Sequence, residues 1–274
     1  MANSRACLYS FALAVSYMAL CQAETPPVAS PKLEPAIDGI TTDRPDFTEG
    51  TDTMRRGILQ LEGGLLTASH SLQEGRTTTR GGPYPLFRLG ISSRVELRLG
   101  SDGLQRESIG EELHQGVADV MAGLKVAIIH EHRFVPAVSV IAALSMPWGA
   151  SYFSSGSVDP VVKLCLSKSL PGGFDVGGNA NVRWDRAGGT VSREYAYSLT
   201  SGHALGRGFR GFAEVYRISP VLGDEAVHWM ADAGTSHPVG HNAQVDAAVG
   251  HTMNARTPYW FVAAGFAIRT PLWH

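Results

Sequence analysis

Cysteine is scarce in this sequence. The chain of 274 residues contains three cysteines, Cys7, Cys21 and Cys165. Two of them lie in the first 23 residues, which we expect to be removed. A single remaining cysteine excludes a framework of intramolecular disulfides. The fold must therefore be held together by packing and hydrogen bonds alone.

Long apolar runs and clusters of one charge are also missing. After residue 23, no stretch approaches the roughly 18 apolar residues of a transmembrane helix. Charged residues make up 18% of the chain, the formal net charge is −2, and no basic run stands out. This profile excludes a nucleic-acid-binding protein. The sequence also has no phosphate loop and no Gly-x-Ser-x-Gly elbow, and we expect no cofactor.

The first 23 residues have the pattern of a secretory signal. Arg5 gives a positive start, the stretch from Ala6 to Leu20 is apolar apart from two serines, and Ala23 offers a small residue before a cleavage site. The alternatives are a buried N-terminal helix, a membrane anchor and a lipoprotein attached at Cys21. We predict a signal peptide at 1–23, a linker with a periplasmic or lumen segment at 24–56, and the main domain at 57–274.

The main domain alternates apolar and polar residues with the period of a β-strand. In Arg94–Leu99, an extended backbone places Val95, Leu97 and Leu99 on one face and the charged residues on the other. The alternation in Phe174–Asp185 is longer than the usual soluble strand of about five or six residues. It matches the roughly 9–11 residues that cross a bilayer at a tilt.

Twelve such segments follow one another, and short and long connections alternate between them. The longer ones include His70–Gly82 and Gly100–Gly116. This layout predicts an all-β fold, an antiparallel transmembrane β-barrel of about 12 strands with both ends on the periplasmic side. A soluble β-sandwich is the alternative, but it does not explain aromatic residues at strand ends, which we expect to form interfacial girdles. These are Phe87, Trp148, Phe174, Trp184, Trp229, Tyr259, Trp260 and Trp273.

Several stretches resemble an outer-membrane family linked to the meta-pathway of phenol degradation and described as transporters. They are Thr42–Glu49, Leu86–Leu99, Gly116–Lys125, Gly240–Asp246 and Trp260–Phe266. The resemblance implies a β-barrel that passes small molecules, aromatic or apolar ones among them, across the outer membrane. One departure is the last residue, His274, because barrels of this type usually end on an aromatic residue that the assembly machinery reads.

By parity, one set of polar side chains faces the barrel lumen, and we expect it to form the substrate path. The alternative is a structural plug of salt bridges. The set comprises Arg94, Glu96, Arg98, Asp119, Lys125, Lys163, Asp175, Asn179, Asn181, Arg183, Glu214, Gln244 and Asp246. A second set precedes the first strand, and we expect it to enter the lumen from the periplasmic mouth. It comprises Asp43, Arg44, Asp46 and Phe47, with Glu49 close behind.

The histidines do not indicate a metal site. His130 and His132 share a face in a strand, but no third ligand is spaced nearby. We therefore expect an outer-membrane barrel with no catalytic residue and no metal, whose partners are lipid, a small-molecule permeant and the barrel-assembly machinery. The open alternatives are a plugged structural or adhesive barrel whose outer loops bind partners, and a barrel hydrolase.

Overall fold

The computed structural model describes residues 40–72, 75–187, 190–219, 227–253 and 259–273. The predicted signal peptide and the start of the predicted linker lie outside these residues. The described chain contains 15 β-strands and one short 3-10 helix, η1 (Ser151–Phe153). The strands are β1 (Ile58–Leu72), β2 (Gly75–Gly82), β3 (Leu86–Gly90), β4 (Val95–Ser101), β5 (Leu104–Ile109), β6 (Glu112–Val117), β7 (Val120–Ile129), β8 (Ala137–Met146), β9 (Asp159–Ser169), β10 (Phe174–Ala187), β11 (Thr190–Gly206), β12 (Phe209–Ile218), β13 (His228–Val239), β14 (Ala243–Thr252) and β15 (Tyr259–Pro271).

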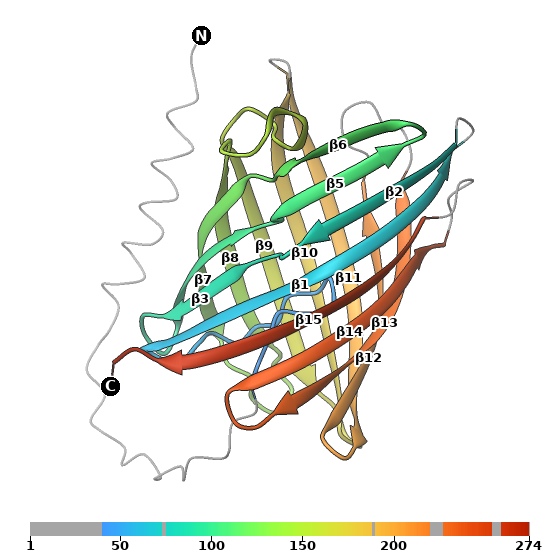
Figure 1. Cartoon of the computed structure of the whole chain (residues 1–274). Helices are drawn as coiled ribbons and strands as arrows, with labels where there is room; N and C mark the ends of the chain where they lie inside the picture. Colours follow the sequence, from blue (N-terminus) through green and yellow to red (C-terminus); the bar gives the residue numbers. More distant parts are fainter. Residues whose placement is uncertain (1–39, 73–74, 188–189, 220–226, 254–258, 274) are drawn as a thin grey trace. The chain divides into compact units, whose positions relative to one another are not determined.

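The strands form one antiparallel sheet that closes on itself (Figure 1). From β7 to β15, consecutive strands pair with each other along the chain. The last strand, β15, then pairs with β1, from Ile58↔Pro271 to His70↔Tyr259. Closure leaves no free edge within the ring, because every strand of the ring has two neighbours. The first and last strands of the barrel therefore meet, as predicted, with the start of β1 beside the end of β15.

Twelve strands cross the barrel, and three of them are interrupted. The first half of β1 pairs with β3 and its second half with β2, so β2 and β3 are two parts of one crossing strand. The same holds for β4 with β5 and for β6 with β7. The breaks lie at residues 83–85, 102–103 and 118–119. The prediction of about 12 strands is confirmed.

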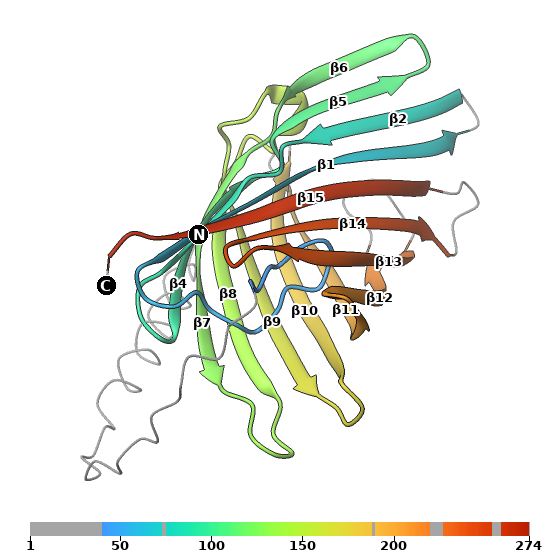
Figure 2. The ribbon, with the colours of Figure 1, turned by 60° about the horizontal axis from the view of Figure 1, so that its bottom comes forward.

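The prediction of loops at His70–Gly82 and Gly100–Gly116 is wrong. These residues form most of β2, β5 and β6, which extend the sheet beyond the breaks (Figure 2). Their sequences are polar on both faces, for example Arg76 to Thr79 and Gln105 to Ser108. A strand that extends beyond the lipid bilayer does not face lipid. The apolar and polar alternation of the other strands is therefore missing in β2, β5 and β6.

The two faces of the barrel wall differ as the alternation predicts. In β4 the side chains of Leu97 and Leu99 are 42% and 47% exposed on the outside, whereas Glu96 and Arg98 are buried inside. Exposed leucine, valine, phenylalanine and tryptophan side chains recur on nearly every strand. A closed barrel with an apolar exterior and a polar interior is the form in which strands cross an outer membrane. Among the described residues, no helix has the length and apolar character to cross a membrane.

The chain before β1 runs inside the ring of strands. Figure 2 shows this stretch, residues 40–56, as a blue trace within the barrel. We call residues 40–56 the N-terminal segment. Its Ile40 and Met54 are buried, and its side chains contact strands from both halves of the sheet. The predicted girdle of aromatic residues needs one correction, because Tyr259 packs against Phe261 inside the barrel.

Candidate functional site: the barrel lumen

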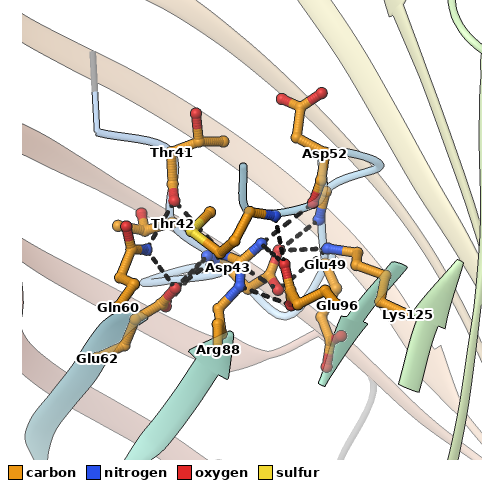
Figure 3. Close-up of polar contacts among 12 residues, drawn as sticks. Thr41, Thr42, Asp43, Glu49, Asp52, Gln60, Glu62, Arg88, Glu96 and Lys125 are labelled. Carbon is orange, nitrogen blue, oxygen red and sulfur yellow. Dashed lines mark hydrogen bonds and ion pairs between the residues drawn. The ribbon is translucent and has the colours of Figure 1, made fainter. Parts of the chain in front are cut away.

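Asp43 is the centre of a buried ion cluster between the N-terminal segment and the barrel wall (Figure 3). Its carboxylate accepts hydrogen bonds from Lys125 Nζ at 3.0 and 3.1 Å and from Arg98 Nη1 at 2.5 Å. Arg88 Nη1 lies 3.5 Å away. These three cations come from β3, β4 and β7, which lie side by side in the barrel wall.

Two wall carboxylates complete the cluster. Arg88 donates from Nη1 to Glu62 at 2.8 Å and from Nε and Nη2 to Glu96 at 2.9 and 3.0 Å. Glu96 also accepts from the backbone N–H of Met54 at 2.8 Å. The side chains of Arg88, Glu62, Glu96 and Lys125 are fully buried. Their charges are matched and hydrogen-bonded, which is the condition under which buried ions are stable.

Glu49 makes a second ionic contact between the segment and the wall. Lys163 Nζ on β9 donates to it at 2.6 Å, and Arg98 Nη2 donates at 3.1 Å. Burial opposes ionisation of Glu49, but Lys163 and Arg98 lower its pKa to about 2. Burial likewise opposes ionisation of Asp43, yet Arg88, Lys125 and Arg98 hold its pKa well below the ordinary value. Both carboxylates are therefore charged at neutral pH.

The opposite wall holds the segment through fewer charges. Glu214 on β12 accepts from the backbone N–H of Phe47 at 2.7 Å and from the Thr48 hydroxyl. Arg44 donates to Asp246 on β14 at 3.2 Å. Gly64 and Gly265 pair across β1 and β15, and a Cβ atom on either would lie within about 2.5 Å of the Arg44 guanidinium. Glycine at this pair leaves the room that the guanidinium occupies.

Side-chain hydroxyl groups of the segment make further contacts with β9, β11 and β14. The hydroxyl oxygens of Thr48 and Ser198 on β11 are 2.6 Å apart, and those of Thr51 and Ser167 on β9 are also 2.6 Å apart. Gln244 on β14 donates to the Thr42 hydroxyl at 2.9 Å. All of these contacts are non-covalent.

An apolar cluster lies inside the barrel beside these polar contacts. Phe47 stacks on Tyr216 with ring centroids 4.4 Å apart and planes within 5°. The cluster also contains Ala68, Met230, Phe261 and Ala263, with Leu66, Ile218 and Tyr259 packed against it. Such a cluster is unusual for the interior of a water-filled barrel, which is normally polar. It gives one side of the lumen a surface for apolar contact.

The lumen contains two cavities, one on each side of the N-terminal segment. One, of about 700 Å³, reaches the short turns and is lined by Ser93, His130, Lys168 and Arg210 among others. The other, of about 610 Å³, reaches the outer extension and is lined by Tyr84, Asp102, Phe153 and Arg183 among others. Arg44, Pro45, Asp46 and Glu49 line both cavities. These four residues therefore divide the lumen.

Most residues of the predicted lumen set take part in this arrangement. Glu96, Arg98, Lys125, Lys163, Glu214, Gln244 and Asp246 contact the N-terminal segment. Asn179 donates to the buried thiol of Cys165 at 3.1 Å, and Asn181 and Arg183 line the outer cavity. The segment residues Asp43, Arg44, Asp46 and Phe47 all lie in the lumen.

Three residues of the set lie away from the centre of the lumen. Arg94 is exposed in the turn before β4. Because β4 begins only at Val95, the alternation of the strand does not apply to Arg94. Asp119 lies in the break before β7, where it accepts from the Gly149 N–H at 2.9 Å. Asp175 forms an ion pair with Arg210 near the short turns, and both side chains are partly exposed.

Sequence reasoning missed four residues that belong to the site. Gln60, Glu62 and Arg88 are fully buried at the ion cluster, and Asp232 lines the outer cavity. The signal for Arg88 was present, because it stands between Phe87 and Leu89 and shares its parity with Glu96 on the paired strand. Among the described residues, no group of three or more His, Cys, Asp and Glu side chains is placed to hold a metal ion.

Comparison with known proteins gives a family and a fold. The model of the family described as "Putative MetA-pathway of phenol degradation" matches residues 42–270. No curated protein matches the chain. Among solved structures, an outer membrane channel from Pseudomonas putida F1 superposes with a TM-score of 0.61 at 11% identity, covering 80% of this chain and 98% of that one.

Two further solved structures show weaker similarity. The translocator domain of the autotransporter NalP from Neisseria meningitidis gives a TM-score of 0.49 at 10% identity, with 80% of this chain and 91% of that one covered. The NanC porin gives 0.46 at 11% identity, with 76% and 98% covered. The similarity to the Pseudomonas channel shows the fold.

Proposed function

Because the chain belongs to the family described as "Putative MetA-pathway of phenol degradation", and because its lumen holds two cavities divided by one segment, we propose that it is an outer-membrane channel for the passive passage of small molecules. The division of the lumen is the observation that carries the proposal. Apart from Arg94 and Asn179, the residues on the predicted substrate path either contact the dividing segment or line one of the two cavities.

The N-terminal segment is the constriction of this channel. It is attached to the wall by ion pairs, hydroxyl contacts and one aromatic stack, and it is part of the same chain as the barrel. Solutes of small size pass beside it, and the apolar cluster gives aromatic or apolar molecules a surface to contact within an otherwise polar lumen. The proposed passage involves no catalytic step and no cofactor. Insertion of the barrel relies on assembly machinery.

A plugged structural barrel is the second candidate, and the buried ion cluster favours it. Four fully buried charged side chains, with Asp43 and Arg98, form a balanced set of three cations and three carboxylates on one side of the lumen. In this function the barrel presents the outer extension of β2, β5 and β6 to a partner, and nothing passes through.

Liposome swelling separates the two candidates. Purified protein is inserted into liposomes, and the initial swelling rate is measured for sugars of increasing size, for phenol and for small aromatic acids. The channel predicts swelling that falls with solute size and is faster for phenol than for a sugar of similar mass. The plugged barrel predicts the swelling rate of empty liposomes for every solute.

A further inference from the structure

We infer that the lumen wall formed by β12 and β13, together with Asp46 of the N-terminal segment, selects for positively charged permeants, including small organic ammonium ions. This inference rests on the proposed channel function and names the charge of the molecules that the channel favours. It does not depend on the apolar exterior or on the ion cluster around Asp43.

The charges of the lumen are distributed unevenly. The cluster on β1, β3, β4, β7 and β9 is balanced: four carboxylates (Asp43, Glu49, Glu62, Glu96) face four cations (Arg88, Arg98, Lys125, Lys163). The opposite side holds Asp46, Glu214, Asp232 and Asp246. Its cations are Arg44, which pairs with Asp246, and Arg210 of β12, which pairs with Asp175 near the short turns. In the part of the chain that the structure describes, no cation within 4 Å pairs with Asp46, Glu214 or Asp232.

The sheet register brings two of these carboxylates together. Glu214 on β12 and Asp232 on β13 are direct cross-strand partners. Both are lumen-facing and buried, with exposures of 4% and 8%. Like charges directly opposite one another in a sheet repel. A cation in the lumen beside them relieves that repulsion.

Asp232 has an oxygen atom available for such a cation. Its Oδ1 is buried and has no hydrogen-bond partner, and its side chain lines the outer cavity. Glu214 is already occupied by Phe47 and Thr48 of the segment. Asp46 lines both cavities, so a cation that moves from one cavity to the other passes it. A negative wall of this kind raises the local concentration of cations and lowers that of anions.

The neighbouring side chains add an apolar surface. Tyr216 lies two residues from Glu214 on the same face of β12, and Phe261, Ala263 and Leu66 line the same cavity. The cations that line this cavity have carboxylates of their own. Arg44 pairs with Asp246, Arg98 with Asp43 and Glu49, and Lys163 with Glu49, while Arg183 lies opposite Glu194 in the register of β10 and β11. An ammonium group attached to a small ring matches this combination of carboxylate and apolar surface.

The test is the reversal potential of single channels in a KCl gradient, followed by swelling of liposomes with benzylammonium and benzoate, which share a ring and differ in charge. We expect the wild type to prefer K⁺ and benzylammonium. Asp232→Asn should lower the K⁺ to Cl⁻ permeability ratio roughly fourfold, because it removes one charge from the lining of the outer cavity. Asp232→Glu should retain the wild-type ratio, and so should Glu112→Gln, which removes an exposed carboxylate of β6.

Heat-modifiable migration on a gel shows first that each variant is folded. A wild type that prefers Cl⁻ and benzoate, or an unchanged ratio in folded Asp232→Asn, would overturn the inference and leave the channel function standing. A wild type without conductance would overturn both. The two failures are therefore distinguishable.

Discussion

The Lys125 ammonium donates to both carboxylate oxygens of Asp43, at 3.0 and 3.1 Å, across 82 positions of the chain. This contact joins the N-terminal segment to β7, and Asp43 makes two further contacts with Arg88 and Arg98. One side chain of the segment therefore balances the excess positive charge of three buried wall cations.

Asp43→Asn should destabilise the folded protein. Removing one partner of a buried ion network leaves unpaired charge and costs about 3–5 kcal/mol. Urea unfolding of the protein in lipid vesicles measures the loss of free energy of unfolding. Asp52→Asn is the matched control, since only the Asp52 carbonyl accepts a hydrogen bond from Arg88 and its carboxylate points away from the cluster (Figure 3). Equal losses in the two variants would contradict the central place of Asp43.

Glu96→Gln should also be damaging. Glu96 accepts from Arg88, Arg98 and the Met54 N–H, and its side chain is fully buried. Neutralising it leaves two guanidinium groups with fewer acceptors, so we expect a loss of similar size, about 3–5 kcal/mol. The same unfolding experiment measures it. A loss below about 0.5 kcal/mol, within the ordinary range of surface substitutions, would show that the cluster tolerates a missing charge.

Leu97→Arg should impair insertion for a different reason. Leu97 is 42% exposed on the outer face of β4, between Glu96 and Arg98 on the inner face. An arginine that faces lipid near the midplane costs about 2–4 kcal/mol. Folding yield in vesicles, with Leu97→Ile as control, tests this. A normal yield for the arginine variant would mean that this face does not meet lipid.

Acidification from pH 7 to pH 5 should leave the constriction in place. The pKa of Glu49 is about 2 and that of Asp43 lies well below its ordinary value, because both are stabilised in the charged form by wall cations. Their contribution is present above the unfolded-state pKa of about 4 and is lost as the pH falls through the folded values. Burial and the nearby Glu214 raise the pKa of Asp46, so protonation there relieves repulsion and opposes opening.

Single-channel conductance at constant KCl, recorded from pH 7 down to pH 3, tests this expectation. A conductance that does not rise as the pH falls to 5 agrees with it, and one that rises between pH 7 and pH 5 contradicts it. The conductance of Asp46→Asn at pH 7 should equal that of the wild type at pH 5.

A disulfide between the segment and β11 should hold the constriction fixed. The Thr48 and Ser198 hydroxyl oxygens are 2.6 Å apart, which places their Cβ atoms near the range that a disulfide spans. Thr48→Cys with Ser198→Cys, in a Cys165→Ser background, should cross-link on oxidation. Conductance of the oxidised protein should fluctuate less than that of the reduced protein. Identical fluctuations in the two states would show that the segment does not move during conduction.

Much of the fold could be predicted from sequence because a strand that separates lipid from a wet lumen must alternate. The alternation in Arg94–Leu99 predicted the two faces of β4, as the exposures of its side chains show, and the alternation in Phe174–Asp185 placed Asn179 inside and Phe174 outside. The extension β2, β5 and β6 could not be recognised, because strands outside an apolar environment lose that signal. Arg94 shows the limit of parity, since the rule does not tell where a strand begins.

The site was harder to predict because it depends on contacts between distant residues. Parity placed Arg98, Lys125 and Lys163 inside the barrel. It could not tell that these cations pair with Asp43 and Glu49 of the N-terminal segment. Glu62 and Arg88 carry the same parity signal and were overlooked among apolar neighbours. The pairing of Glu214 with Asp232 follows from the register of β12 and β13, which no local pattern specifies.

The central claim is that the N-terminal segment divides the lumen of a channel. Removal of residues 40–56, with the residues before them retained, tests it most directly by single-channel conductance in a planar bilayer. The account predicts that the folded deletion variant conducts several times more current than the wild type, because the two cavities then join. Equal conductance in the two proteins would contradict it.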